Sequence, residues 1–274
     1  MMLNYKIHEN GWTAFVDIDL KTCTQEDINN IAKLVSTNVV VVFNNQFLTV
    51  EDELRILRMF KNLKPLYDSD HPLFSDYAVD TEGLICRVTG ELRDGKQGMG
   101  WWPVDFDWHA DSPQMPNRED IIYLYAERGS KGSRTSWTNS IVAYNELSDK
   151  LKQRISNLHC VYGNIEAPFA PDFTEVRYNY DWTPGVVRKN NTGEIGLYFM
   201  PLQLKQFVEL SQEESDELKE TLRQHIFKDN YVYHHDWQDG DLIIADQWNG
   251  LHKRWAFDKM DIRVMHRATM DYPT

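Results

Sequence analysis

The stretch Trp108-His109-Ala110-Asp111 is the part of the chain from which both a fold and a site can be predicted. If this stretch is extended, His109 and Asp111 point to the same face, because side chains alternate along a strand. A second imidazole comes from far along the chain, in Leu251-His252-Lys253-Arg254. Two histidines and one carboxylate are the donor set that holds Fe(II) and leaves other coordination positions open. The sequence therefore predicts a metal site built from two distant segments.

The short pattern has a competitor elsewhere in the chain. With 9 histidines and 42 acidic residues among 274, about one His-x-acid pattern is expected by chance. His234-His235-Asp236 also fits it, but it precedes an Asp-Gly turn and favours a strand end or a cross-strand polar pair. His109 and Asp111 follow a loop and precede Pro113, which ends a strand, a position typical of the mouth of a barrel. On spacing alone, His252 fits a surface loop equally well.

Length and composition favour a single globular domain over residues 1–274. Hydrophobic residues make up 42% of the chain and charged residues 26%, and there is no repeat or linker. The net charge of −13 argues against nucleic acid or an anionic membrane as the main partner. The longest apolar run, 39–43, is too short to span a bilayer. Three widely spaced cysteines and the lack of a secretory signal predict reduced thiols and a cytoplasmic location.

Hydrophobic periodicity and capping residues predict the elements. Helices are predicted after Thr24 and Thr49, over 143–158, and after Ser211. Strands are predicted at 39–43, 120–126, 196–200, 231–237, 241–245 and 263–269. We therefore expect a mostly β fold, with a jelly-roll-like core and helices packed on one side. Residues 68–107 are rich in Gly, Pro, Asp and aromatics, which predicts an active-site lid or binding loop.

Further motifs follow the first in a fixed order. Residues 135–148 (TSWTNSIVAYNELS), 240–246 (GDLIIAD) and 263–269 (RVMHRAT) frame His252. Together with His109-x-Asp111, this series resembles the taurine-dioxygenase-like family of Fe(II)/2-oxoglutarate-dependent oxygenases. The wording RVTG at 87–90, DWHAD at 107–111 and DQWNGLHKR at 246–254 resembles a branch distinct from taurine dioxygenase itself. The resemblance extends over about residues 10–270.

The resemblance implies a double-stranded β-helix fold and assigns roles to particular residues. His109, Asp111 and His252 match the Fe(II) ligands. Arg263 matches the arginine that pairs with the far carboxylate of 2-oxoglutarate, and Thr135 matches the hydroxyl residue that assists it. A guanidinium suits that task because it binds a carboxylate through two parallel hydrogen bonds. Without the resemblance, Arg263 would be read as a surface or salt-bridged strand residue and Thr135 as a turn residue.

Arg267 matches a second arginine of the family, which contacts a substrate anion or lies near the iron-bound end of the co-substrate. A separation of four residues on a strand places Arg267 on the same face as Arg263. The alternative for Arg267 is an internal salt bridge to one of the many acids. His266 falls on the opposite face, which predicts a structural role. Asp246 is predicted to be a hydrogen-bonding scaffold residue.

The implied activity is oxidation, most often hydroxylation, of a small polar substrate with O₂ and 2-oxoglutarate, releasing succinate and CO₂. We expect a carboxylate-bearing or amino-acid-like metabolite. Taurine is disfavoured, because the register of His71-Pro72 does not match the family's sulfonate-binding residues. The substrate pocket is predicted to include Met99, Trp101 and Trp102, for which ordinary packing is an equal alternative. A homo-oligomer is compatible with these expectations.

Two other functions remain open on the sequence. A non-catalytic jelly-roll module that binds ligands through its 9 tryptophans would need no tight Fe(II) site. A metal-dependent hydrolase or isomerase would use the same triad without O₂. The second alternative leaves Arg263 and Thr135 unexplained.

Overall fold

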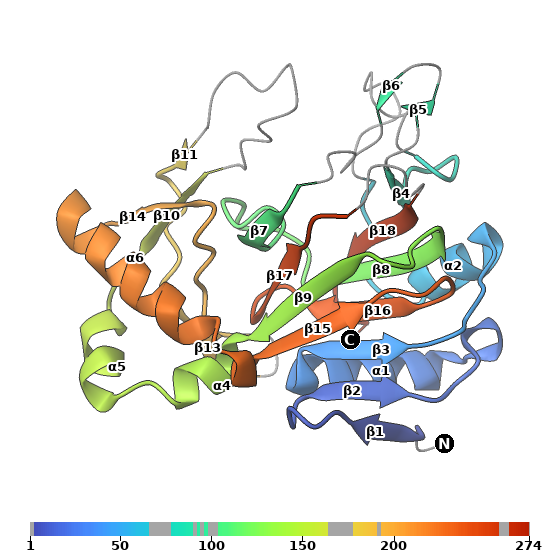
Figure 1. Ribbon diagram of the computed structural model, residues 1–274, viewed down its shortest axis with the longest axis horizontal. Helices are drawn as coiled ribbons and strands as arrows, with labels where there is room; N and C mark the ends of the chain where they lie inside the picture. Colours follow the sequence, from blue (N-terminus) through green and yellow to red (C-terminus); the bar gives the residue numbers. More distant parts are fainter. Residues whose placement is uncertain are drawn as a thin grey trace.

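Two β-sheets pack face to face and form the core (Figure 1). The computed structural model describes residues 3–65, 78–89, 92–93, 96–97, 104–163, 178–190, 193–257 and 263–273. Within them, the larger sheet has the order β1 (Tyr5–Ile7), β2 (Thr13–Val16), β3 (Val40–Phe43), β16 (Leu242–Asp246), β8 (Ile121–Arg128), β18 (Val264–Met270) and β4 (Cys86–Thr89). The smaller sheet has the order β15 (Val232–Asp236), β9 (Arg134–Asn139), β17 (Gly250–Arg254) and β7 (Phe106–His109). The predicted double-stranded β-helix is confirmed.

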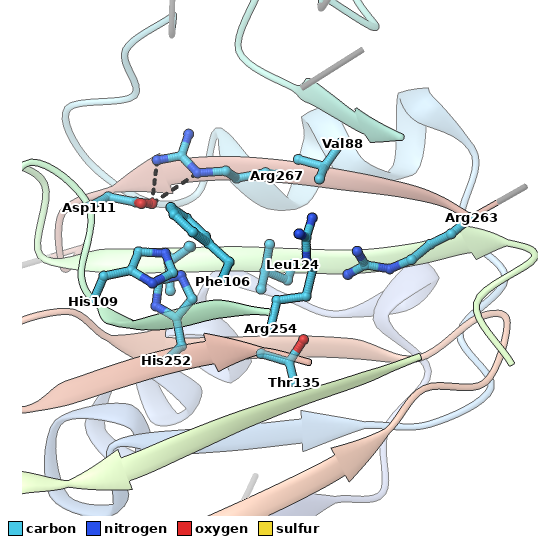
Figure 2. A pocket seen from close by; sticks show the side chains of 11 residues that line it. Val88, Phe106, His109, Asp111, Leu124, Thr135, His252, Arg254, Arg263 and Arg267 are labelled. Carbon is cyan, nitrogen blue, oxygen red and sulfur yellow. Dashed lines mark hydrogen bonds and ion pairs between the residues drawn. The ribbon is translucent and has the colours of Figure 1, made fainter. Parts of the chain in front are cut away.

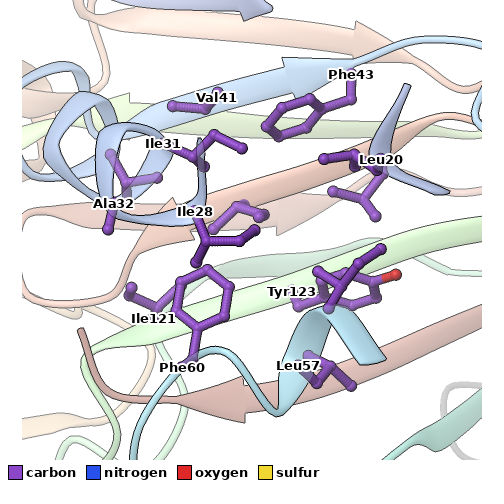
Figure 3. Packing of buried hydrophobic residues seen from close by; sticks show 14 of the residues in the cluster. Leu20, Ile28, Ile31, Ala32, Val41, Phe43, Leu57, Phe60, Ile121 and Tyr123 are labelled. Carbon is purple, nitrogen blue, oxygen red and sulfur yellow. The ribbon is translucent and has the colours of Figure 1, made fainter. Parts of the chain in front are cut away.

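Both faces of the larger sheet are buried, which explains the continuous apolar runs of its central strands. On β3, Val40 and Val42 face the smaller sheet, where they join Trp137 of β9. Val41 and Phe43 point the other way, into a cluster that is closed by helices (Figure 3). One strand thus contributes to two cores, because its side chains alternate between the faces.

Helices α1 (Gln25–Asn38) and α2 (Val50–Leu57) form the helical layer expected on one side of the core (Figure 1). Each begins with a capping box, in which the side chain of Thr24 or Thr49 accepts a hydrogen bond from the backbone three residues on. Phe60 lies beyond the end of α2 but still packs into the same cluster. Local sequence signals therefore fix both helix starts.

A second group of helices packs with small sheets against a separate buried cluster. The group contains α4 (Ser140–Asn145), α5 (Asp149–Ile155), α6 (Gln212–Ile226), β10 (Cys160–Gly163), β11 (Tyr178–Asn179), β12 (Val187–Lys189), β13 (Ile195–Leu197) and β14 (Leu204–Phe207). The single helix predicted over 143–158 is wrong. Asn139 caps α4, and Ser148 caps a new helix by accepting from Leu151 N, so the segment divides in two.

The segment predicted as a lid, 68–107, is only partly described. Within it, Cys86–Thr89 forms β4 and pairs with β18, so this portion belongs to the larger sheet rather than to a loop. Two short strands, β5 (Leu92–Arg93) and β6 (Lys96–Gln97), pair with each other. Met99, Trp101, Trp102 and His71 lie outside the described residues.

The predicted strand over 108–111 ends earlier than expected. β7 stops at His109, and Ser112 has a positive φ of 50° that turns the chain just before Pro113. Asp111 N–H donates to Gln247 Oε1 at 3.2 Å instead of to a neighbouring strand. None of the described helices combines the length and the apolar character needed to cross a membrane.

Candidate metal centre

The two predicted histidine ligands lie directly across a strand pair. His252 of β17 is the register partner of His109 of β7, and their ring centroids are 4.1 Å apart. Ligand atoms of His109, Asp111 and His252 all lie within 4.8 Å of one another (Figure 2). In the part of the chain that the structure describes, no other group of three such residues meets this geometry. The structure thus brings the predicted triad together.

Both imidazoles are held in the neutral form, in which a ring nitrogen can bind a metal. His109 Nδ1–H donates to the carbonyl oxygen of Asp107 at 2.6 Å, which leaves Nε2 for coordination. Burial lowers the pKa of His109, and it lowers the pKa of His252 to about 3. Neutral imidazole is the form that ligates metals, so no proton has to leave either ring near neutral pH.

Asp111 is held by Arg267 on β18 of the larger sheet. Arg267 Nε and Nη2 both donate to Asp111 Oδ2, at 3.0 and 2.6 Å. Burial opposes ionisation of Asp111, but the charge of Arg267 outweighs it and holds the pKa of the carboxyl well below its usual range. Both bonds end on Oδ2, and no described residue donates a hydrogen bond to the other carboxylate oxygen. The internal salt bridge that was the alternative for Arg267 is therefore present, with a triad member as its partner.

The turn that carries Asp111 is braced by two residues that the sequence did not reveal. Arg118 donates to the backbone oxygen of Asp111 at 3.1 Å and also to that of Gln247. Gln203 Nε2 donates to Ala110 O at 2.9 Å. These contacts fix a non-strand segment whose carboxylate must meet two strand histidines. No motif or spacing marks Arg118 or Gln203 in the sequence.

One pocket connects the triad to a group of cationic and polar side chains (Figure 2). Its lining consists of Val88, Phe106, His109, Asp111, Ile122, Leu124, Thr135, His252, Arg254, Arg263 and Arg267. Figure 2 shows the triad at one end and Thr135, Arg254 and Arg263 at the other. Apolar side chains of β4 and β8 separate the two ends. Both predicted 2-oxoglutarate residues and Arg267 therefore share a cavity with the triad.

Arg263 is a buried cation with little to neutralise it. Only 5% of its surface is exposed, and no described carboxylate lies within ion-pair distance. Its Nη2 contacts Met265 Sδ at 2.5 Å, and its Nε has no hydrogen-bond partner among the described residues. Burial and the charge of Arg254 lower the pKa of Arg263 to about 9. Such a group is stabilised by an incoming carboxylate.

Thr135 offers a hydroxyl hydrogen to the same end of the pocket. Trp237 Nε1–H donates to Thr135 Oγ1 at 2.9 Å, so the oxygen already accepts a bond from the protein. The remaining hydroxyl hydrogen is then the polar group that Thr135 presents to a ligand. Arg254, next to Thr135 in register, was missed by sequence reasoning. Its spacing of two from His252 is the signal that would have found it, because both lie on one face of β17.

The residues predicted to be structural have that role. His266 Nδ1 lies 2.6 Å from Glu53 Oε1 on the opposite face of β18 from Arg267. Asp246 accepts from the backbone of Trp248 and Asn249 and from the Tyr272 hydroxyl.

The second His-x-Asp pattern forms the predicted cross-strand polar pairs. His234 Nδ1 lies 2.6 Å from Ser136 Oγ, and Arg134 holds Asp236 through two hydrogen bonds.

Comparisons with known proteins give the same answer as the geometry. The family model described as "Taurine catabolism dioxygenase TauD, TfdA family" matches residues 5–269. Pentalenolactone F synthase from Streptomyces arenae is 29% identical over 205 residues, covering 67% of this chain and 68% of the relative. The alpha-ketoglutarate-dependent 2,4-dichlorophenoxyacetate dioxygenase from Cupriavidus pinatubonensis is 23% identical and covers 92% of both chains.

Solved structures share the fold over nearly the whole length. The crystal structure of AAD-2 in complex with Mn(II) and N-oxalylglycine has a TM-score of 0.79 at 20% identity, covering 98% of this chain and 97% of that one. A taurine dioxygenase from Burkholderia xenovorans has a TM-score of 0.77 at 23% identity, covering 98% of this chain and 89% of that one. The family model matches most of the chain, and three side chains that could hold a metal ion meet at one pocket. The chain belongs to the TauD/TfdA family and is an Fe(II)- and 2-oxoglutarate-dependent oxygenase.

Proposed function

We propose that this protein hydroxylates a small, carboxylate-bearing or amino-acid-like molecule, with His109, Asp111 and His252 as its Fe(II) ligands. The observation that carries the proposal is the convergence of these three side chains, within 4.8 Å, at one end of a pocket whose other end holds Arg263 and Thr135. In the overall reaction a C–H bond becomes C–OH, O₂ is consumed, and 2-oxoglutarate is oxidised to succinate and CO₂.

The donor set fits Fe(II) on chemical grounds. Two neutral imidazoles and one carboxylate match the facial triad, which leaves room for a chelating co-substrate and O₂. When bound, Fe(II) supplies the activation of O₂. Arg267 keeps Asp111 ionised and oriented, and the Asp107 carbonyl fixes the ring of His109. These contacts set the ligand geometry before any substrate arrives.

The other end of the pocket binds the co-substrate tail. Arg263 and the Thr135 hydroxyl hold the distal carboxylate of 2-oxoglutarate, which places its 2-oxo acid end next to the triad. Val88 and Leu124 line the wall between the two ends and keep water from the chain of the co-substrate. A low local dielectric strengthens the ion pair with Arg263.

The class of the primary substrate is suggested by the names of relatives. One acts on 2,4-dichlorophenoxyacetate and another, from Sphingobium herbicidovorans, is named an (S)-phenoxypropionate dioxygenase, so both names specify a carboxylate. A direct contact between Arg267 and a substrate anion stays a prediction, since its guanidinium is engaged with Asp111.

The ligand assignment is tested by anaerobic titration of the Fe(II)-loaded protein with 2-oxoglutarate. We expect a visible metal-to-ligand charge-transfer band that is absent in His252→Ala and retained in His234→Ala, a matched histidine outside the pocket. A band that persists in His109→Ala and His252→Ala overturns the assignment.

The reaction is tested by a metabolite screen that reads succinate. Candidate carboxylates, amino acids and taurine are added with O₂ and 2-oxoglutarate, and hydroxylated product is identified by mass spectrometry. We expect a carboxylate to stimulate succinate release and to gain one oxygen atom. Turnover of a substrate without O₂ would instead support a hydrolase or isomerase.

A further inference from the structure

Two guanidinium groups, not one, approach the far end of the pocket. Arg254 ends β17 in the smaller sheet, whereas Arg263 immediately precedes β18 in the larger sheet. Both line the pocket, and Figure 2 shows their guanidinium groups turned toward the same space above Thr135. The two cations therefore meet from opposite sheets across a single cavity.

The arrangement is held in place by contacts that leave both groups buried. Arg254 Nη2 donates to Val104 O at 2.8 Å. The ring of Phe257 faces both cations, with its centroid 5.2 Å from Arg254 Cζ and 5.6 Å from Arg263 Cζ. Only 7% of Arg254 and 5% of Arg263 are exposed. Their positions are thus built into the fold and do not depend on flexible surface side chains.

The two buried cations repel each other across the cavity, although Asp105 offsets part of the charge of Arg254. The charge of Arg254 adds to burial in lowering the pKa of Arg263, which reports the repulsion. A carboxylate placed between Arg254 and Arg263 would offset both charges.

We propose that Arg254 is a second arginine for the distal carboxylate of the co-substrate and forms a clamp with Arg263. The inference rests on the proposed function. A carboxylate has about four lone-pair positions, enough for two bonds from Arg263, one from the Thr135 hydroxyl and one from Arg254. The clamp makes the far carboxylate a strict requirement, so the pocket selects dicarboxylic 2-oxo acids over monocarboxylic ones.

The test compares two metal-chelating probes on the Mn(II)-loaded protein. N-oxalylglycine has a distal carboxylate, whereas oxamate keeps the chelating end without it. In calorimetric titrations, we expect Arg254→Gln to raise the Kd of N-oxalylglycine by about 10- to 100-fold and that of oxamate by less than about 3-fold, because one charge-assisted hydrogen bond is lost. Arg134→Gln, an exposed arginine on β9, is the matched control and should change neither Kd.

A structural role for Arg254 gives a different pattern. If Arg254 only braces Val104, both probes weaken equally in Arg254→Gln, and that result overturns the clamp. Unchanged N-oxalylglycine affinity overturns it as well. Arg254→Lys, which keeps the charge but loses the forked donor set, should bind N-oxalylglycine with intermediate affinity. If Arg254→Gln folds poorly, the Kd of N-oxalylglycine for Arg254→Lys tests the clamp instead.

The same titrations separate this inference from the proposed function. Arg263→Gln should weaken N-oxalylglycine at least as much as Arg254→Gln does. If Arg263→Gln has no effect, the co-substrate assignment itself fails. If Arg263→Gln weakens binding and Arg254→Gln does not, only the clamp fails.

Discussion

The chain contains the pattern His-x-Asp twice, and the two copies have opposite fates. His109 and Asp111 meet His252, with both histidines buried and Asp111 partly buried, whereas His234 and Asp236 are exposed on β15. Each aspartate even has its own arginine, bound through two hydrogen bonds. The two regions therefore share the short sequence pattern and an arginine that binds its aspartate.

The regions differ in what lies across from them. Both strands are edges of the smaller sheet, but β7 pairs with β17, so His109 faces His252, whereas β15 pairs with β9, so His234 faces Ser136. The side chains of Arg267 and Asp111 are 13% and 23% exposed, against 43% and 65% for Arg134 and Asp236. Among the described residues, a third potential metal ligand and low exposure are thus present at only one of the two patterns.

The largest expected difference between the two patterns is the loss of Mn(II) affinity when a histidine is removed. We expect His252→Ala to weaken Mn(II) binding on the order of 1,000-fold or more, beyond the roughly 10–100-fold typical of residues that only orient ligands. His234→Ala should leave the Kd unchanged, because its ring contacts Ser136 and no triad member. Calorimetry on both variants measures the difference, and comparable losses would contradict the assignment of the inner copy.

Removal of Arg267, the arginine that binds Asp111, should have a smaller effect. It should lower the unfolding free energy by an amount that depends on the metal. Arg267→Gln leaves Asp111 as a largely buried carboxylate without its arginine, so the metal-free protein should lose up to about 3 kcal/mol of unfolding free energy. Mn(II) should restore part of this loss, because the ion replaces the missing positive charge. Urea denaturation with and without Mn(II) measures both values. A loss that Mn(II) does not reduce would mean that Arg267 stabilises the fold independently of the ligand.

His266 with Glu53 and Glu127 shows how buried histidine–carboxylate contacts affect stability where no metal is expected. The carboxylates of Glu127 and Glu53 outweigh burial and raise the pKa of His266 to about 9 from an unfolded value of 6.5. Since the folded pKa is the higher one, this stabilisation is complete below pH 6.5 and is lost as pH rises through 9. The change amounts to roughly 3 kcal/mol. Unfolding free energies at pH 7 and pH 9.5 should differ less in His266→Gln, and an equal pH dependence would contradict the shift.

Sequence reasoning succeeded where the determinant is local or carried by a family motif. The capping boxes at Thr24 and Thr49 begin helices as predicted, because their hydrogen bonds span three residues. The grouping of His109, Asp111 and His252 was predicted from their spacing and the family resemblance, and the structure brings the three together, whereas their binding of a metal stays a prediction. The sequence predicted Arg263 and Thr135 by resemblance, and the structure places both in the triad's pocket. Their binding roles stay predictions.

Prediction from the sequence failed for contacts between residues that are far apart in the chain and belong to no motif. The strand at 86–89 was taken for part of a loop because its partner, β18, lies far along the chain. Arg267 had 42 acids to choose from, and only the packing of the two sheets selects Asp111. Arg254 was missed although its alternation with His252 was readable, because no motif drew attention to it. Contacts across sheets depend on register, which a short motif does not encode.

The smallest expected effect is the coupling energy of Arg134 and Asp236, the ion pair of the exposed His-x-Asp pattern. Arg134 and Asp236 form an ion pair with the same chemistry as Arg267 and Asp111, but water screens the exposed charges. A double-mutant cycle with Arg134→Gln and Asp236→Asn should give a coupling energy below about 1 kcal/mol, and less at high salt. The corresponding inner pair should couple more strongly and hardly respond to salt. Equal coupling energies would show that burial is not what separates the two copies, and that β17 alone makes the difference by bringing His252 to His109.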